Sequence, residues 1–261
     1  MQLRIEEKIT AIIKTIDRPQ SLDILIKSIK KYYPNLPIIV ADDSQSPISR
    51  KDVEYHIIPF DSGIAKGRNY LVGQVKTPYV LQLDDDFCFI KETSLEKLLY
   101  VLENSDIDIV GGKWIWNKRV HSYHGKLLCE NGVLIHTKES SGESFGFKLY
   151  DIIHNFFLAR TDTLKRYPWD DRLKVKEHED YFLTHKGKIK VALHPEVFIY
   201  HNQTRTESYN KFRGRDRIYY PLLKEKHGIL KFAKGSHFEK LDKKLFCKET
   251  LSKYLNHDSN K

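Results

Sequence analysis

Three adjacent aspartates, Asp84, Asp85 and Asp86, follow the apolar run YVLQL at residues 79–83. Mutual repulsion and the desolvation of carboxylates beside a core strand both cost free energy. The arrangement therefore indicates that a positive group is bound at the end of this strand. The alternative interpretation is a solvated acidic turn.

A second acidic group, Glu177, Glu179 and Asp180, lies in KEHEDYFL at residues 176–183. A carboxylate can remove a proton from a hydroxyl, and repulsion among three neighbours raises at least one pKa toward a useful range. Glu177 and Asp180 share a face because they are three residues apart on a predicted helix. The alternative is a helix start that is capped and paired with Lys174 and Lys176.

A third candidate is GIAKGRN at residues 63–69. Gly63 allows a ligand to approach the backbone, and Lys66, Arg68 and Asn69 lie near a predicted helix start, where anionic phosphate is stabilised. The GxxxxGK[ST] spacing of a P-loop is absent.

The elements that must position these residues alternate between strand and helix. Helical patterns occupy 21–34, where Ser21 is placed as a cap, 62–75 and 94–104. Apolar β-rich runs occupy 8–16, 36–44, 55–60, 79–86 and 107–112. This alternation predicts a mostly parallel sheet with helices on both faces. Ligands bind beyond the carboxyl ends of such strands, where Asp42, Asp43 and the acidic triplet lie.

The pattern changes after residue 112. Residues 113–150 predict a β-rich insertion with a hairpin turn at 130–132. A strand and a short helix are expected in 155–167, a loop and a helix in 170–187, and a closing pair of strands in 190–202. A helical tail follows from 205 to 261.

Net charge is concentrated in that tail. The whole chain carries +9, of which residues 205–261 contribute +8, from 15 Lys and Arg against 7 Asp and Glu. The tail is interpreted as a docking surface for a membrane face, a phosphorylated acceptor or nucleic acid; the alternative is a solvated helical face. No apolar run approaches the roughly 20 residues that cross a bilayer, and the start lacks a signal-peptide pattern. Three widely spaced cysteines suggest neither disulfides nor zinc, so a cytoplasmic setting is expected.

Several segments together resemble inverting GT-A glycosyltransferases of the family 2 type. They are IKTIDRP, ADDS, GIAKGRN, YVLQLDDDF, DIVGG, NFFLARTD, WDDRLKVKEHEDYFL and FIYHN. The order is most similar to the catalytic domain of the ganglioside-type β-1,4-N-acetylgalactosaminyltransferases and covers about residues 8–202. It implies a Rossmann-like GT-A domain over 1–204, with a nucleotide-binding half at 1–112 and an acceptor and catalytic half at 113–204.

The resemblance also implies roles for the donor site. A divalent cation, Mn²⁺ or Mg²⁺, would neutralise the donor diphosphate, with Asp86 and His201 as its ligands. Asp84 would face the ribose, with Asp85 as a helper. Further nucleotide contacts are implied for Thr15, Arg18 and Asp43, beside Gly63, Lys66, Arg68 and Asn69.

For the reaction, the resemblance places the base at Asp180, with Glu177 in reserve. One base opposite the leaving group implies a single displacement with inversion. Trp114, Trp116 and Tyr123 are candidate acceptor contacts in the insertion.

The expected activity is transfer of a hexose or N-acetylhexosamine, GalNAc first, from a UDP-sugar to a glycan or glycolipid hydroxyl. A bacterial enzyme of surface polysaccharide or lipo-oligosaccharide synthesis is expected, cytoplasmic and held peripherally at the inner membrane through 205–261. No nucleic-acid partner is expected. Two alternatives stay open: a metal-dependent sugar nucleotidyltransferase, and a nonenzymatic nucleic-acid-binding module.

Overall fold

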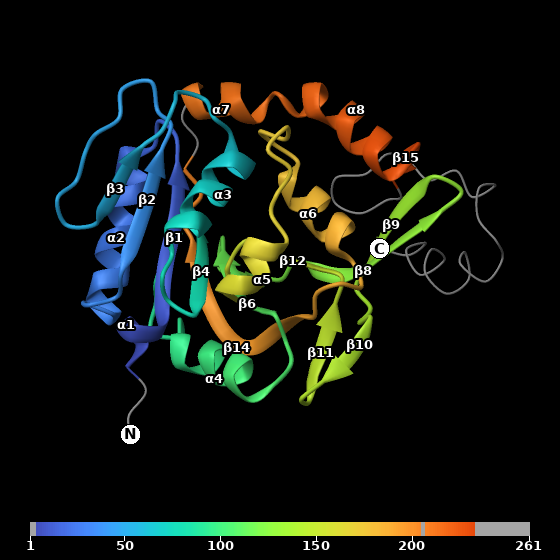
Figure 1. Cartoon of the computed structure of the whole chain (residues 1–261), viewed down its shortest axis with the longest axis horizontal. Helices are drawn as coiled ribbons and strands as arrows, with labels where there is room; N and C mark the ends of the chain where they lie inside the picture. The colour runs from blue at the N-terminus through green and yellow to red at the C-terminus, as the bar shows by residue number, and fades with distance from the viewer. Residues whose placement is uncertain (1–3, 205–206, 233–261) are drawn as a thin grey trace.

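The computed structural model describes residues 4–204 and 207–232. Within them, one large sheet forms the centre of the molecule (Figure 1). Its strands are β1 (Ile9–Thr15), β2 (Ile38–Asp42), β3 (Glu54–Ile57), β4 (Tyr79–Asp84), β5 (Phe87–Cys88), β6 (Ile109–Trp116), β7 (Arg119–His121), β10 (Gly142–Ser144), β11 (Phe147–Tyr150), β13 (Phe157–Arg160) and β14 (Val191–His201). Their order is β10-β11-β14-β6-β13-β4-β1-β2-β3, and β5 and β7 pair with β14 and β6.

The β3-β2-β1-β4 half of this sheet is parallel, as the alternating pattern predicts. Strand β1 is buried along nearly its whole length, which explains its continuous apolar run. Thr15 lies beside Asp42 of β2, and Lys14 lies beside Asp84 of β4. The carboxyl ends of the three strands therefore meet at one edge of the sheet.

Helices cover both faces of the sheet. They are α1 (Ile5–Lys8), α2 (Pro19–Tyr32), α3 (Ile64–Gln74), α4 (Leu95–Asn104), α5 (Thr161–Arg166), α6 (Glu177–His185), α7 (Glu207–Arg213) and α8 (Asp216–His227). Helices α2 and α4 contribute to one hydrophobic core, and α3, α5 and α6 contribute to the other. The predicted Ser21 cap is wrong: α2 begins at Pro19, a residue favoured in a first turn, and Ser21 lies inside the helix.

The β-rich insertion is present: β7, β10 and β11 join the central sheet, and two further strands contribute to a second, smaller sheet. Its strands are β8 (His124–Glu130), β9 (Val133–Thr137), β12 (Ile152–Ile153) and β15 (Lys231–Phe232), in the order β12-β8-β9-β15. The predicted hairpin turn is confirmed, because Asn131 and Gly132 both have positive φ between the paired Glu130 and Val133. The predicted closing strand pair is wrong. Strand β14 runs unbroken for 11 residues, with a register shift between Leu193 and Phe198.

Helices α7 and α8 cross the top of the molecule from the β1 side to α6 (Figure 1). Strand β15 then joins the second sheet beside β9. The predicted tail is thus helical over 207–213 and 216–227 and packs on the domain, while 233–261 lies outside the described residues. The boundary at 204 stays a prediction.

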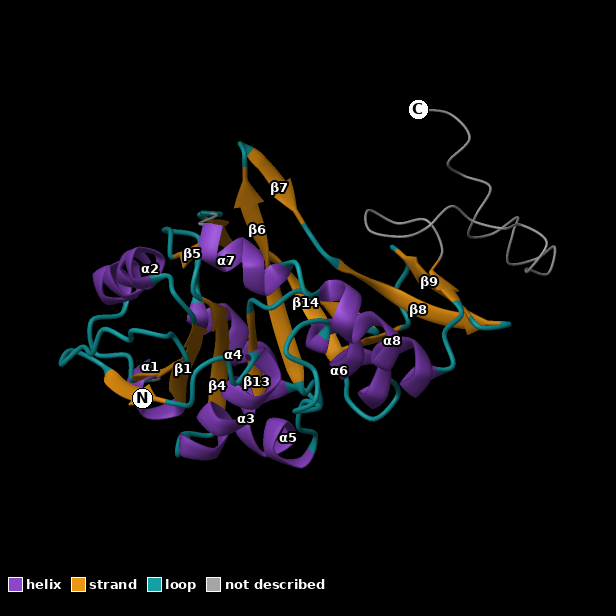
Figure 2. Cartoon of the chain, turned by 90° about the horizontal axis from the view of Figure 1, so that it is seen from above, coloured by secondary structure: helices purple, strands orange, loops and turns teal. Residues whose placement is uncertain are grey.

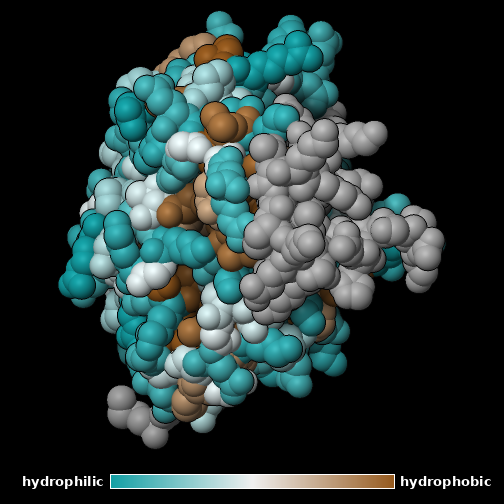
Figure 3. All heavy atoms as spheres, turned by 90° about the vertical axis from the view of Figure 1, so that its right-hand side faces the viewer, coloured by the Kyte–Doolittle hydropathy of each residue, from teal (hydrophilic) through white to brown (hydrophobic). Residues whose placement is uncertain are grey.

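The outer surface is mostly hydrophilic on the face at the right of Figure 1, with a band of apolar residues down its middle (Figure 3). Among the helices of the described residues, none has the length and apolar character needed to span a membrane.

Candidate active site

A cavity of about 410 Å³ opens at the carboxyl ends of β1 and β4. Its wall includes the acidic triplet, Arg18 and Arg68, together with the start of α6 and part of α7. This volume lies within the range of small-molecule sites, roughly 300–1,000 Å³. The structure therefore brings the two acidic groups of the sequence to one cavity.

Asp85 and Asp86 are the buried members of the triplet, and Asp85 holds two neighbouring side chains. The Thr15 hydroxyl donates to Asp85 Oδ2 at 2.7 Å, and Arg18 Nη1 donates to Asp85 Oδ1 at 2.7 Å. Burial nevertheless raises the pKa of Asp85 to about 7, against the opposing charge of Arg18. Asp85 thus anchors Thr15 and Arg18 beneath the cavity.

Asp86 lies between two cationic or potentially cationic groups. Arg18 Nη2 donates to Asp86 Oδ2 at 2.9 Å, and His201 Nε2 is 3.2 Å from the same oxygen. Burial favours the neutral acid, but the hydrogen bond from His201 and the charge of Arg18 outweigh it and hold the pKa of Asp86 below its ordinary value. The carboxylate form of Asp86 is therefore stabilised.

Asp84 faces the other acidic group across Arg68. Arg68 Nη2 donates to Asp84 Oδ1 and Arg68 Nη1 donates to Glu177 Oε1, both at 2.9 Å. Asn155 Nδ2 donates to the second oxygen of Asp84 at 3.0 Å. Burial raises the pKa of Glu177, and the charge of Arg68 opposes that shift. The structure thus places Glu177 at the cavity wall beside Asp84.

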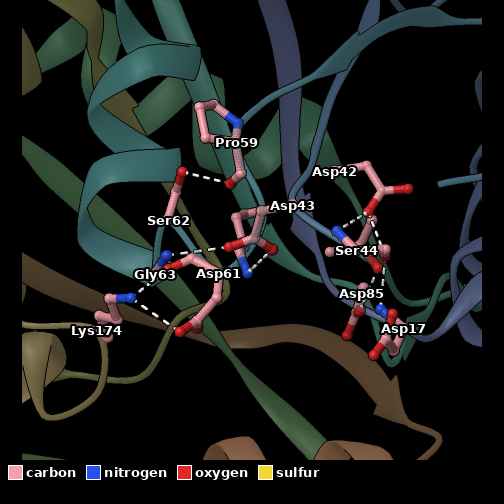
Figure 4. Close-up of polar contacts among 12 residues, drawn as sticks. Asp17, Asp42, Asp43, Ser44, Pro59, Asp61, Ser62, Gly63, Asp85 and Lys174 are labelled. Carbon is pink, nitrogen blue, oxygen red and sulfur yellow. Dashed lines mark hydrogen bonds and ion pairs between the residues drawn. The ribbon is translucent and has the colours of Figure 1, made fainter. Parts of the chain in front are cut away.

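Asp43 is fully buried and supports the turn before α3 (Figure 4). The Gly63 amide donates to Asp43 Oδ2 at 3.0 Å, and Lys14 forms an ion pair with the other oxygen. Gly63 has φ +93°, and a Cβ there would lie 2.6–2.8 Å from Lys174, so only glycine fits.

Lys66 and Asn69 of GIAKGRN lie away from the cavity, whereas Ile64 and Arg68 line it. Lys66 is exposed and absent from the cavity wall. Asn69 instead donates to the Trp169 carbonyl at 2.8 Å and accepts from the Trp169 amide at 3.0 Å, which fixes the loop before α6. Their nucleotide contacts stay predictions.

Asp180 is turned away from the cavity. Its side chain is 1% exposed, and its oxygens lie 2.9 Å from Lys226 Nζ and 2.8 Å from His227 Nε2, both at the end of α8. Glu177, His178 and Glu179 line the cavity, whereas Asp180 does not. Sequence spacing places Glu177 and Asp180 on one face of α6. Helix α8 covers the Asp180 end of that face, so of the two only Glu177 reaches the cavity.

Helix α7 supplies cavity residues that the sequence interpretation missed. Tyr209 and Asn210 line the cavity, and the Tyr209 ring lies 4.1 Å from the guanidinium carbon of Arg18. Arg215 anchors this segment through two hydrogen bonds to Asp61, of 2.6 and 2.7 Å. The only sequence signal was aromatic residues within a basic segment.

Asp86 and His201 fit a divalent cation of the Mn²⁺ type, which accepts both carboxylate oxygen and imidazole nitrogen. In the described residues, no cluster of three or more His, Cys, Asp or Glu residues could hold a metal. A cation here would therefore need most of its ligands from phosphate oxygens and water, as is common for cations that bind with nucleotides.

Comparison with known proteins identifies the family. Residues 10–167 match the family described as Glycosyl transferase family 2. This chain belongs to glycosyl transferase family 2. It is 38% identical over 231 residues to Beta-1,4 N-acetylgalactosaminyltransferase 2 of Mus musculus, and 37% identical over 212 residues to Beta-1,4 N-acetylgalactosaminyltransferase 1 of Rattus norvegicus. These alignments cover 81% and 77% of the chain, but only 44% and 40% of the relatives.

Solved structures of S. aureus TarS have the same fold. Residues 1–349 of TarS in complex with UDP-GlcNAc give a TM-score of 0.56 with 18% identity, covering 78% of this chain and 60% of TarS. A second structure of TarS residues 1–349 gives a TM-score of 0.53 with 19% identity, covering 74% of this chain and 60% of TarS. The expected GT-A fold is thus confirmed, and so is the expected similarity to the β-1,4-N-acetylgalactosaminyltransferases.

Proposed function

We propose that the chain transfers an N-acetylhexosamine, GalNAc first, from a UDP-sugar to a hydroxyl of a glycan acceptor, with inversion at the anomeric carbon. The proposal is supported by similarity to the N-acetylgalactosaminyltransferases and to TarS, which was solved in complex with UDP-GlcNAc. The main structural support for this function is that the aspartate triplet and Glu177 line one cavity at the carboxyl ends of the strands.

The cavity is lined by carboxylates as well as cations, so a nucleotide diphosphate bound there would need additional positive charge. Lys14, Arg18, Arg68 and Lys176 all line the cavity. Asp86 and His201 would hold a divalent cation, which when bound acts as a Lewis acid that neutralises charge on the diphosphate. Asp84 and Asp85 keep their proposed nucleotide roles, in which Thr15 and Asp85 act as one hydrogen-bonded pair. Asp43 is fully buried and would support the nucleotide site indirectly, through Lys14 and the Gly63 amide.

Glu177 is the base that the geometry favours, in preference to Asp180. A base must reach the acceptor hydroxyl, and Glu177 lines the cavity while Asp180 is enclosed by Lys226 and His227. Glu177 takes the hydroxyl proton as the acceptor oxygen attacks the anomeric carbon. The bond from that carbon to the UDP oxygen breaks, and UDP leaves with the electron pair. One displacement inverts the configuration.

The deciding experiment offers the purified chain UDP-GalNAc, UDP-Gal, UDP-GlcNAc and UDP-Glc, each with Mn²⁺, Mg²⁺ or EDTA, and measures UDP release. We expect release that is fastest with UDP-GalNAc and lost in EDTA and in Asp86→Asn. Pyrophosphate formation from UTP and a sugar 1-phosphate would instead identify a nucleotidyltransferase. Absence of both products would reject the proposal.

The biological setting stays a prediction. A role in bacterial surface glycan synthesis and peripheral membrane contact through 205–261 both remain expectations from the sequence. Within the described part of that segment, Arg215 and Lys226 contact Asp61 and Asp180 of the domain, so these two cations serve packing inside the protein.

A further inference from the structure

The β6–β7 hairpin projects beyond the rest of the sheet (Figure 2). Trp116 pairs with Arg119 across a two-residue turn. The turn residues Asn117 and Lys118 have φ of 46° and 61°, which is the conformation of a type I′ turn. This turn matches the natural twist of paired strands, which favours the hairpin and sets the register of its two strands.

One face of this hairpin is aromatic. Trp114 lies directly opposite His121, with ring centroids 5.7 Å apart and planes 18° apart. Trp116 lies diagonally across, its ring also 5.7 Å from that of His121. We call Trp114, Trp116 and His121 the hairpin aromatic face. Trp116 is 41% exposed, so this face presents a large aromatic surface to solvent.

The hairpin aromatic face continues from the candidate active site. Strands β6 and β14 pair in parallel, with Trp114 beside Ile199 and Ile115 beside Tyr200. One further step of this register places Trp116 beside His201, on the same side of the sheet, because side chains alternate along a strand. Trp114 also contacts His154, with ring centroids 4.7 Å apart, and the next residue, Asn155, holds Asp84.

We propose that the hairpin aromatic face binds a sugar ring of the acceptor glycan. The inference rests on the proposed function. A pyranose ring has an apolar face of C–H groups that can pack on an indole, and hydroxyls at its edge that need hydrogen bonds. Among the residues that the structure describes, His121 Nε2 has no hydrogen-bond partner, and a rotation of the ring toward solvent would let it meet one such hydroxyl. The nucleotide has its own place in the cavity at β1 and β4, so this face serves the acceptor.

The test uses Trp116→Ala and Trp116→Phe in the full chain. Val120→Ala is the matched control, because Val120 is 57% exposed on the same hairpin and pairs with Ile115 on the opposite face. Methyl glycosides of galactose, glucose and N-acetylglucosamine are tested as acceptors by stimulated UDP release. Their binding to the UDP-saturated protein is measured by saturation-transfer NMR.

We expect Trp116→Ala to raise the acceptor KM roughly tenfold while the Kd for UDP changes less than about twofold. Trp116→Phe should restore most acceptor affinity, and Val120→Ala should behave as wild type. An unchanged acceptor KM in Trp116→Ala, an equal effect of Val120→Ala, or no glycoside bound to a wild-type protein that releases UDP would overturn the inference. A wild-type protein that neither binds UDP nor releases it from any UDP-sugar would instead refute the proposed function.

Discussion

Asp84 and Glu177 are joined through a single guanidinium. Arg68 donates at 2.9 Å to each, so the end of β4 and the start of α6 are fixed together although they are far apart in sequence. Arg68 is 2% exposed. The two carboxylates therefore keep a constant separation at the cavity wall, which would help to orient bound substrates.

Removing Arg68 should destabilise the protein strongly. Arg68→Ala leaves buried Glu177 without its cation, and loss of one partner of a buried pair costs about 3–5 kcal/mol. Arg68→Lys should give an intermediate loss, because one ammonium cannot reproduce the fork that reaches both carboxylates. Urea unfolding measures both variants.

The control for this series is Arg217→Ala, since Arg217 is exposed on α8. It should change the free energy of unfolding by less than about 0.5 kcal/mol. Equal stability of Arg68→Ala and Arg217→Ala would contradict the bridging role of Arg68.

Isosteric amide variants separate the two candidate bases. Glu177→Gln should lower kcat by about 10²–10⁴ with little change in UDP affinity, because it removes the proton acceptor and keeps the shape. Asp180→Asn should retain far more activity but unfold more easily, because Lys226 and His227 lose their shared carboxylate. Kinetics and urea unfolding are measured on the same preparations. The reverse pattern would restore Asp180 as the base.

The sequence could predict which strand-end residues meet at the candidate site, because its strands pair in parallel. Thr15, Asp43 and Asp84 each follow or end an apolar strand, and parallel strands bring such ends together. The contact between Thr15 and Asp85 needs only neighbouring strands. The order of strands and helices therefore contained most of this information.

The orientation of α6 could not be predicted in this way. Helical spacing puts Glu177 and Asp180 on one face, but which of them meets solvent depends on what packs there. That partner is α8, whose Lys226 and His227 lie more than 40 positions away and carry no spacing signal. Tyr209 was missed for a similar reason, since the basic charge of its segment suggested an outward surface.

The pH dependence of kcat/KM should reflect the ionisation of the Glu177 carboxyl group. Burial raises the pKa of Glu177 above its ordinary 4.5. Because a base acts only when deprotonated, kcat/KM should rise with pH through this raised pKa, at higher pH than for an exposed glutamate. Rates measured from pH 4.5 to 9 should show this acid limb, and the residual activity of Glu177→Gln should lack it.

The contribution of Glu177 to the free energy of unfolding should fall as pH rises, opposite to the trend in activity. The folded state holds the Glu177 proton more tightly than the unfolded chain, so ionisation disfavours folding. Its contribution to stability is greatest below pH 4.5 and declines as pH rises toward the raised pKa. Urea midpoints of wild type minus those of Glu177→Gln should therefore fall across that window; a difference that rises would contradict the burial of the ionised group.

Tyr209 should matter for nucleotide affinity although it lies outside the matched family region, residues 10–167. Its ring lies 4.1 Å from the guanidinium carbon of Arg18, the residue that holds Asp85 and Asp86. Loss of this cation–π contact in Tyr209→Ala should weaken UDP binding by roughly tenfold, equivalent to about 1.4 kcal/mol. Tyr209→Phe keeps the ring face and should bind nearly as wild type, as should Ile218→Ala on the exposed side of α8. Titration calorimetry with UDP and Mn²⁺ measures all three, and equal affinity of Tyr209→Ala and wild type would show that α7 only covers the cavity.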